Sequence, residues 1–205
     1  MLVKSLAVGE IGANCFILME EGSGAAVIID PGAEAQRIMA ELNSLKAKLQ
    51  YIIISHGHLD HISAVDEIRQ ATGAKVLIHR LDADCLTDPK KNLSAFFGLP
   101  VEAKEADQLL EDGQIIKFGS HELKILHTPG HTVGGICISS EAGLFSGDTL
   151  FAGSVGRTDF PGGSMEVLIN SIREKLLVLD PSTMVYPGHG LATTIGDEKL
   201  NNPFL

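Results

Sequence analysis

Three histidines and one aspartate lie within six consecutive positions of the chain. The segment 56–61 reads His-Gly-His-Leu-Asp-His and follows the apolar run Tyr51-Ile52-Ile53-Ile54. A short apolar run rich in β-branched residues is typical of a buried strand, so the cluster is placed where a strand ends and a loop begins. Histidines two apart in extended backbone point to one side, and Asp60 and His61 follow one step further on. Imidazole and carboxylate groups bind metals, and the spacing predicts a metal site with residues to spare for a second centre.

Three further segments repeat the pattern of an apolar strand, a tight turn and one candidate ligand. They end in Pro129-Gly130-His131, Gly147-Asp148 and Pro187-Gly188-His189. Chance could supply one Pro-Gly-His, but two of them together with Gly-Asp and the first cluster are hard to explain as histidines of an ordinary core. We therefore expect four strand ends to meet at one rim and to form a metal site.

Composition indicates a single domain spanning 1–205. The chain has 205 residues, is 44% hydrophobic, and shows no linker or shift of composition. Its N-terminal apolar stretch is too short for a signal peptide or membrane span, so we expect a cytoplasmic protein with no membrane partner. The net charge of −10 argues against nucleic acid as a partner. The three cysteines are far apart, which favours neither a disulfide framework nor a thiolate zinc site.

Strands and helices both recur along the chain, which predicts mixed sheets covered by helices, an α+β (α/β) fold. Helices are predicted over 34–48, 61–72 and 164–177, and Asp60 is placed to cap the second while binding metal. Residues 86–106 are expected to form an apolar loop packed on the core, with a mobile flap as the alternative. Strands are predicted at about 2–8, 14–19, 25–30, 51–55, 75–79, 114–118, 121–127, 135–139, 143–147 and 183–187.

These motifs, in this order, resemble the metallo-β-lactamase superfamily over nearly the whole chain. The resemblance implies a four-layer αββα sandwich with the site at one edge of its sheets. It assigns His56, His58 and His131 to one metal, Asp60, His61 and His189 to the other, and Asp148 to both. The ligand types suit two divalent ions, with Zn²⁺ first and Fe or Mn as alternatives. Asp60 and Asp148 would be catalytic, and a metal-bridging hydroxide positioned by Asp148 would attack a carbonyl.

Three longer segments resemble the glyoxalase II group, in particular the short bacterial type II hydroxyacylglutathione hydrolases. They are 127–132, 147–151 and 153–163, together with the ending from Pro187 to Leu205. The resemblance implies hydrolysis of a small-molecule thioester such as S-D-lactoylglutathione. Full-length glyoxalase II adds a C-terminal helical domain that supplies basic residues for glutathione. Only 16 residues follow His189 here, so no separate glutathione-binding domain is expected.

The alternative is a persulfide dioxygenase of the same fold. Resemblance to that family implies a mononuclear iron site, whose ligands here would be His56, His131 and Asp148. Its last histidine usually lies in Pro-Ala-His-Asp-Tyr, whereas this chain has Pro-Gly-His-Gly at 187–190, which favours the hydrolase. Nucleases of the superfamily and a non-catalytic metal-binding module are both less favoured.

The other candidate side chains have more ordinary interpretations. Arg157 is predicted either to clamp a substrate carboxylate or to pair with Asp159 or Asp148 within its glycine-rich loop. His79 and His121 are expected to be structural or solvated, and His127 to be an ordinary strand residue.

Overall fold

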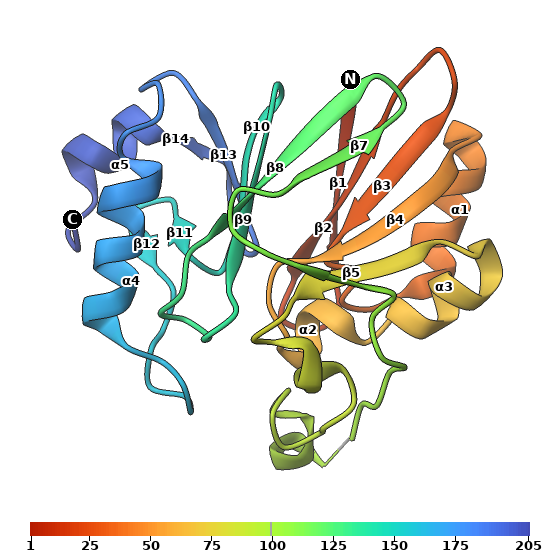
Figure 1. Cartoon of the computed structure of the whole chain (residues 1–205), viewed down its shortest axis with the longest axis horizontal. Helices are drawn as coiled ribbons and strands as arrows, with labels where there is room; N and C mark the ends of the chain where they lie inside the picture. Colours follow the sequence, from red (N-terminus) through yellow and green to blue (C-terminus); the bar gives the residue numbers. More distant parts are fainter. Residues whose placement is uncertain (99) are drawn as a thin grey trace.

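Two six-stranded sheets lie face to face at the centre of the molecule, and helices cover the outer face of each (Figure 1). The computed structural model describes residues 1–98 and 100–205. This four-layer arrangement in a single domain confirms the predicted fold. Across the described ranges, every helix is too short or too polar to cross a membrane.

The first sheet has strand order β1-β2-β3-β4-β5-β6 and changes from antiparallel to parallel at β3. Because β3 to β6 are parallel, their carboxyl ends meet at one edge, and the helices α1 and α3 provide crossovers on the outer face. The elements of this half are β1 (Leu2–Val8), β2 (Ala13–Met19), β3 (Ala25–Ile29), α1 (Ala35–Leu45), β4 (Lys48–Ile54), α2 (Leu59–Ile62), α3 (Val65–Thr72), β5 (Lys75–His79), the 3₁₀ turns Ala83–Leu86 and Ser94–Phe97, and β6 (Gln108–Leu110).

The second sheet has strand order β14-β13-β10-β9-β8-β7. The strands β8, β10 and β13 run in the same direction, because β9 is antiparallel to both β8 and β10, and β10 is parallel to β13. Their carboxyl ends therefore share one edge. The elements are β7 (Ile115–Phe118), β8 (His121–His127), β9 (Ile136–Ser140), β10 (Gly143–Gly147), the hairpin β11 (Leu150–Phe151) and β12 (Ser154–Val155), α4 (Met165–Ser171) with the π-helix Ile172–Leu176, β13 (Met184–Pro187), β14 (Thr193–Thr194) and α5 (Ile195–Asn201).

Three apolar layers hold the four structural layers together. One layer packs α1 and α3 on the first sheet, one lies between the sheets, and one packs α4 and α5 on the second sheet. Between the sheets, the ring of Phe145 lies 5.1 Å from that of Phe16 and 5.0 Å from that of Tyr186. Both strands β2 and β3 are buried along their whole length, which explains why their sequences are apolar except for Asn14. The cysteines Cys15 in β2 and Cys137 in β9 are buried and free.

Two helix predictions need correction. The helix predicted at 34–48 ends at Leu45, because Lys46 adopts a left-handed conformation and Lys48 already pairs with β3. The helix predicted at 61–72 is two helices, α2 and α3. Asp60 does not cap either one, because it lies inside the first turn of α2 and its carboxylate faces His61 and His189. The third helix does begin after Ser164, whose hydroxyl accepts a bond from the Val167 N–H.

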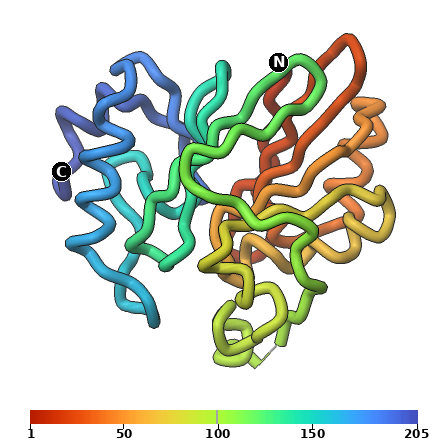
Figure 2. Tube along the Cα trace, viewed as in Figure 1, coloured from red at the N-terminus to blue at the C-terminus, as the bar shows by residue number. Residues whose placement is uncertain are grey.

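The segment 86–106 projects at the lower end of the molecule (Figure 2). Its residues Leu86, Leu93 and Ala103 are buried, but Phe96 and Phe97 are 72% and 64% exposed. The prediction of an apolar loop packed on the core is therefore wrong for the two aromatic residues. Leu99, in the same predicted loop, lies outside the described residues. The short elements β6, β11, β12, β14 and α5 were not predicted, because strands of two or three residues and a mainly polar helix of seven carry no clear periodicity.

The turn after β2 is joined to the turn between β7 and β8 by the carboxylate of Glu20. It accepts bonds from the Ser120 N–H at 2.9 Å and the Ser120 hydroxyl, and from the Ser23 hydroxyl. The Ser120 and Ser23 hydroxyls lower the pKa of Glu20 to about 2.

A carboxyl pKa that is lower in the folded state stabilises the fold above its unfolded value, and this contribution is lost as the pH falls through the folded value. We therefore expect wild type to exceed Glu20→Gln in free energy of unfolding at pH 6, with the difference shrinking between about pH 5 and pH 2. Urea denaturation at several pH values measures it. A difference that stays constant with pH would contradict the role of the charge.

Candidate metal centre

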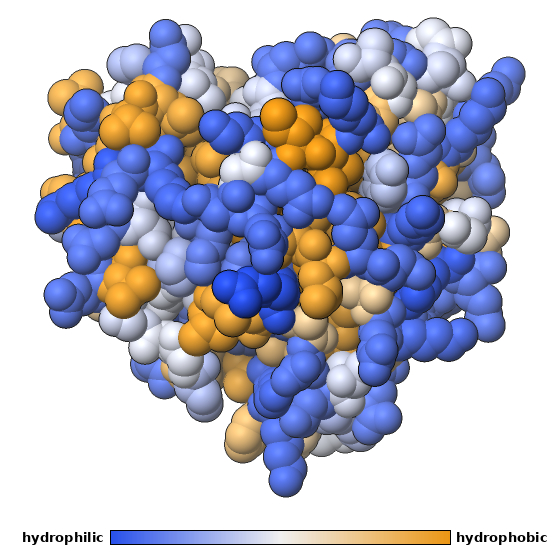
Figure 3. Space-filling view, in the orientation of Figure 1, coloured by the Kyte–Doolittle hydropathy of each residue, from blue (hydrophilic) through white to orange (hydrophobic). Residues whose placement is uncertain are grey.

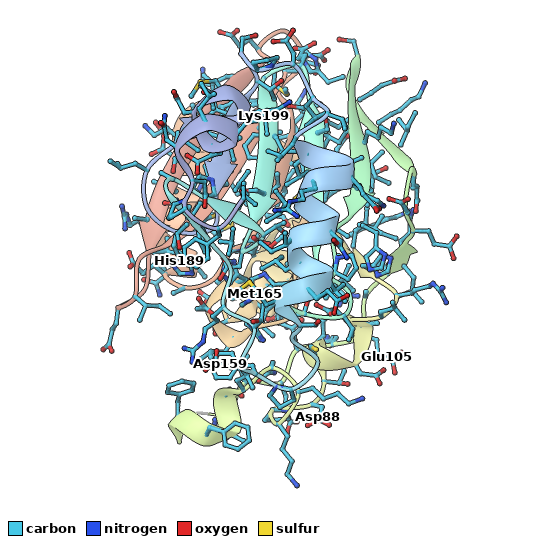
Figure 4. The ribbon with its side chains drawn as sticks, turned by 90° about the vertical axis from the view of Figure 1, so that its left-hand side faces the viewer. Asp88, Glu105, Asp159, Met165, His189 and Lys199 are labelled. Carbon is cyan, nitrogen blue, oxygen red and sulfur yellow. The ribbon has the colours of Figure 1, made fainter. Side chains whose placement is uncertain are left out.

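Seven predicted ligand side chains lie together at the edge where the carboxyl ends of β4, β8, β10 and β13 meet. The cluster at 56–61 follows β4, His131 follows β8, Asp148 follows β10, and His189 follows β13. The expectation that four strand ends share one rim is thus confirmed. Figure 4 shows His189, Asp159 and Asp88 in succession toward the lower end of the molecule, where this edge and the projecting segment lie. The ligand types and their approach decide what the site can hold.

One group consists of three imidazoles whose ring nitrogens converge. Nε2 of His131 lies 3.2 Å from Nε2 of His56 and 2.9 Å from Nδ1 of His58. The other nitrogen of His131, Nδ1, lies 2.7 Å from the Arg157 carbonyl oxygen. A carbonyl can only accept, so Nδ1 carries the proton and Nε2 of the neutral ring presents a lone pair to its neighbours.

The same reasoning applies to His56. The Ser55 hydroxyl donates to Asp30 Oδ2 at 2.5 Å, so toward His56 Nδ1, 3.1 Å away, it can only accept. Nε2 of His56 therefore also presents a lone pair, toward that of His131. Two lone pairs at 3.2 Å repel each other unless a cation lies among them. This arrangement fits a metal ion better than a network of hydrogen bonds.

The second group consists of Asp60, His61 and His189. Asp60 Oδ2 lies 3.3 Å from His61 Nε2 and 3.1 Å from His189 Nε2. Asp30 Oδ2 lies 3.1 Å from Nδ1 of His61, which turns Nε2 of the neutral His61 ring into an acceptor facing this group. Each group offers three ligand atoms within 4.8 Å of one another.

Asp148 lies between the two groups. Its Oδ2 is 3.7 Å from Nε2 of His131 in the first group and 3.7 Å from Nε2 of His189 in the second. Its Oδ1 and the Nε2 of His61 are buried and have no hydrogen-bond partner among the described residues. Buried polar atoms are rarely left unpaired, so these two atoms are a second sign that the residues present fit a metal centre.

The protonation of the two groups differs. Burial and the neighbouring imidazoles lower the pKa of His56 well below its usual value, and burial lowers the pKa of His58 to about 3. Both rings are therefore neutral near pH 7, the form that binds metal. Burial also acts to lower the pKa of His61, but Asp148, Asp30 and Asp60 outweigh it and raise the pKa well above its usual value. The second group thus favours a positive charge, whether a proton or a cation.

Asp30 holds the end of β4 in place through its bonds to Ser55. It was not predicted as a site residue. It is 1% exposed, and it accepts the Ser55 N–H at 2.7 Å, the Ser55 hydroxyl and a bond from Nδ1 of His61. It thereby orients His61 directly and His56 through Ser55. Its position at the end of the predicted strand 25–30 was the available signal, but Asp-Pro-Gly there is equally typical of a turn.

Replacing Asp30 by Asn should weaken metal binding about tenfold or more, since carboxylates behind metal-binding histidines typically contribute this much. Competition with a chromophoric chelator measures the affinity. Asp107→Asn is the matched control, because Asp107 also accepts a backbone N–H, from Val76, but lies at the start of β6. Equal losses in the two variants would contradict a role of Asp30 at the centre.

Glycines allow the segments of the centre to approach closely. A Cβ atom at Gly188 would lie 2.3 Å from Asp148 Oδ1, and one at Gly156 would lie 1.9 Å from the Asp148 carbonyl oxygen. A Cβ at Gly32 would lie 1.6 Å from the Asp60 carbonyl oxygen. No side chain fits at these three positions. This accounts for glycine in the Pro-Gly-His motif at 187–189 and in the Asp-Pro-Gly motif at 30–32.

A pocket of about 380 Å³ opens onto both groups of candidate ligands. Its walls are mainly apolar, with Ile11, Phe97, Phe151 and Phe160 among them. In Figure 3 apolar surface gathers near the middle of the face, and the lower outline is indented beside the projecting segment.

Arg157 lies at this pocket, but its guanidinium is already engaged. It donates two 2.7 Å bonds to Asp159 and lies 3.9 Å from the centre of the Phe160 ring. Of the two predicted roles, the structure thus shows pairing with Asp159, which holds the glycine-rich loop. Binding of a substrate carboxylate stays a prediction.

The remaining histidines lie outside the centre, as expected. His79 is buried and its ring stacks on that of His127 at 4.0 Å, while His121 lies 3.1 Å from Glu141. None of the three belongs to a candidate metal group among the described residues.

The fold and the site define a member of the metallo-beta-lactamase superfamily. The family model matches residues 8–189, so the chain belongs to this superfamily of metal-dependent proteins. Among relatives, hydroxyacylglutathione hydrolase GloC of Haemophilus influenzae is 38% identical over 209 residues, covering 100% of this chain and 98% of that protein.

Solved structures give the same family. The B3 metallo-beta-lactamase BLEG-1 has a TM-score of 0.95 and 38% identity, covering 100% of this chain and 99% of its own. TTHA1623 in a di-iron-bound form has a TM-score of 0.88 and 35% identity, covering 99% and 100%. ETHE1 from Myxococcus xanthus has a TM-score of 0.83 and 29% identity, covering 99% and 84%.

Proposed function

We propose that this protein hydrolyses the thioester bond of a hydroxyacyl thioester such as S-D-lactoylglutathione. The observation that carries the proposal is the pair of ligand groups joined by Asp148, because a hydrolase of this kind uses two ions. The similarity to GloC over the full length of both chains supports the same activity.

The ligand assignment follows the two groups. His56, His58 and His131 would hold one ion, Asp60, His61 and His189 the other, and Asp148 would contact both. Zinc is the first candidate, and iron or manganese suits the same donors. When bound, two divalent ions supply a water deprotonated near neutral pH and polarise the thioester carbonyl.

The side chains of this chain would position the reactants. The carboxylate of Asp148 lies where it can orient the attacking water and accept its proton, and Asp60 fixes His189 through the 3.1 Å contact. The mainly apolar pocket would exclude bulk water and hold the acyl group over the centre. No serine or cysteine nucleophile is required.

A persulfide dioxygenase is the second candidate. The similarity to ETHE1 fits it, and so does a site in which only His56, His131 and Asp148 hold one iron. Asp60, His61 and His189 would then have no metal to bind, although they form a complete group of ligand atoms. This is why we place the hydrolase first.

One assay separates the two functions. Purified protein of measured metal content is given S-D-lactoylglutathione in one reaction and glutathione persulfide under oxygen monitoring in the other. We expect release of free thiol in the first and no oxygen uptake in the second. Oxygen uptake without thioester cleavage would overturn the proposal.

A further inference from the structure

A second pocket, of about 410 Å³, adjoins the pocket over the metal centre. His58 lines both pockets. Neighbouring residues divide between them, since Phe97 and Phe160 line the first while Phe96 and Pro161 line the second. The two pockets therefore adjoin at His58.

The second pocket differs from the first in charge. Lys90 and Lys91 line it, and both are exposed. Lys91 Nζ lies 2.5 Å from Asp84 Oδ2, whereas Lys90 makes no ion pair with any residue within 1–98 or 100–205. In the first pocket, by contrast, the one cationic side chain of the wall, Arg157, is fully engaged by Asp159.

The second pocket also contains two carboxylates, Asp82 and Asp84, which differ in how they interact with the lysines. Asp82 is 1% exposed and accepts bonds from the Gly57 N–H, the Thr132 hydroxyl and the Gly134 N–H, so its charge is satisfied within the protein. Asp84 is exposed and competes directly for Lys91. On a chain with net charge −10, two adjacent lysines beside the centre form a local site for an anion.

We propose that the second pocket binds the acid-bearing thiol portion of the thioester, with Lys90 and Lys91 recognising its anionic groups. This inference rests on the proposed thioester hydrolysis. The carbonyl would lie at the candidate ligands, the acyl group in the apolar pocket, and the thiol portion beyond His58. A lysine ammonium is a compact charge that binds carboxylate and phosphate alike, and the volume is that of a small-molecule subsite.

Three S-D-lactoyl thioesters test the charge preference: those of glutathione, which carries carboxylates, coenzyme A, which carries phosphates, and neutral N-acetylcysteamine. We expect the double variant Lys90→Ala/Lys91→Ala to raise KM for an acid-bearing thioester by roughly five- to tenfold. KM for the neutral thioester and kcat for all three should change less than about twofold. Whichever acid-bearing thioester shows the larger change identifies carboxylate or phosphate as the preferred group.

Two further variants sharpen the test. Asp84→Asn releases Lys91 from its partner and should lower KM for the same acid-bearing thioester, a direction opposite to that of the lysine variant. Lys124→Ala, an exposed lysine of β8 that lines neither pocket, is the matched control and should change nothing. Equal changes in KM for all three thioesters, or no change in any, would overturn the inference.

A binding measurement separates failure of this inference from failure of the proposed function. Calorimetry with S-methylglutathione and with coenzyme A, neither of which carries a thioester, should show weaker binding of at least one of them to the double variant than to wild type. If no thioester is hydrolysed, the proposed function fails, but calorimetry still tests the pocket. Absent binding of both ligands, or equal binding of both to the two proteins, would overturn the inference.

Discussion

Replacing Asp148 by Asn should lower kcat for thioester hydrolysis by at least roughly 10²–10³-fold, the effect of removing a group that stabilises charge in the transition state. The carboxylate lies 3.7 Å from a histidine nitrogen of each ligand group, and its buried Oδ1 has no hydrogen-bond partner among the described residues. An amide of the same shape keeps the packing but loses the charge that both groups share. Steady-state kinetics with S-D-lactoylglutathione measures the effect.

The fold should survive this change, because Asp148 lies at the end of β10 and not in the apolar layers. Circular dichroism and thermal unfolding of the variant check this. Glu174→Gln is the control, since Glu174 is an exposed carboxylate of the π-helix that belongs to no candidate metal group. Full activity in Asp148→Asn would contradict the two-ion mechanism.

Removing bound metal should abolish hydrolysis and lower thermal stability. A ligand present at 100 times its Kd stabilises the folded state by about 2.7 kcal/mol, which for a chain of this size corresponds to about 5–10 °C in Tm for each site. We expect about two ions per chain by elemental analysis of the active protein. Scanning calorimetry before and after treatment with a chelator measures the change in Tm.

Adding the ions back should restore both activity and Tm, which distinguishes metal loss from irreversible damage. The stoichiometry also separates the two candidate functions. One iron and no second ion per chain, together with oxygen uptake on glutathione persulfide, would rule against the hydrolase and favour the dioxygenase.

The sequence predicted where the candidate ligands meet better than it predicted what lies around them. All seven candidate ligands follow apolar strands and lie in short motifs, so their common edge could be inferred. Asp30 was missed, because a residue 31 positions before His61 carries no local sign that it contacts that ring. The split of the helix at 61–72 was missed because both helices carry the same apolar periodicity.

The surroundings of the segment 86–106 also could not be predicted from the sequence. Its sequence contains Phe96, Phe97, Lys90 and Lys91 without a recognisable element, and its apolar residues were assigned to the core. The fold instead leaves both phenylalanines exposed and places one in each of the two pockets. Only the neighbours of a residue in space decide whether an apolar side chain fills a core or lines a pocket.

The sequence by itself determined the type of chemistry, because histidine and aspartate at the ends of apolar strands are costly to bury without a cation. The tertiary structure decided which of these residues lie within reach of one another, which carboxylates contact them, and that two pockets adjoin at His58. Those features depend on contacts between segments up to 176 positions apart, such as Asn14 with Gly190, and no local pattern encodes such contacts. The physical reason is that strand direction and sheet order, not spacing along the chain, set the distances between side chains at the shared edge.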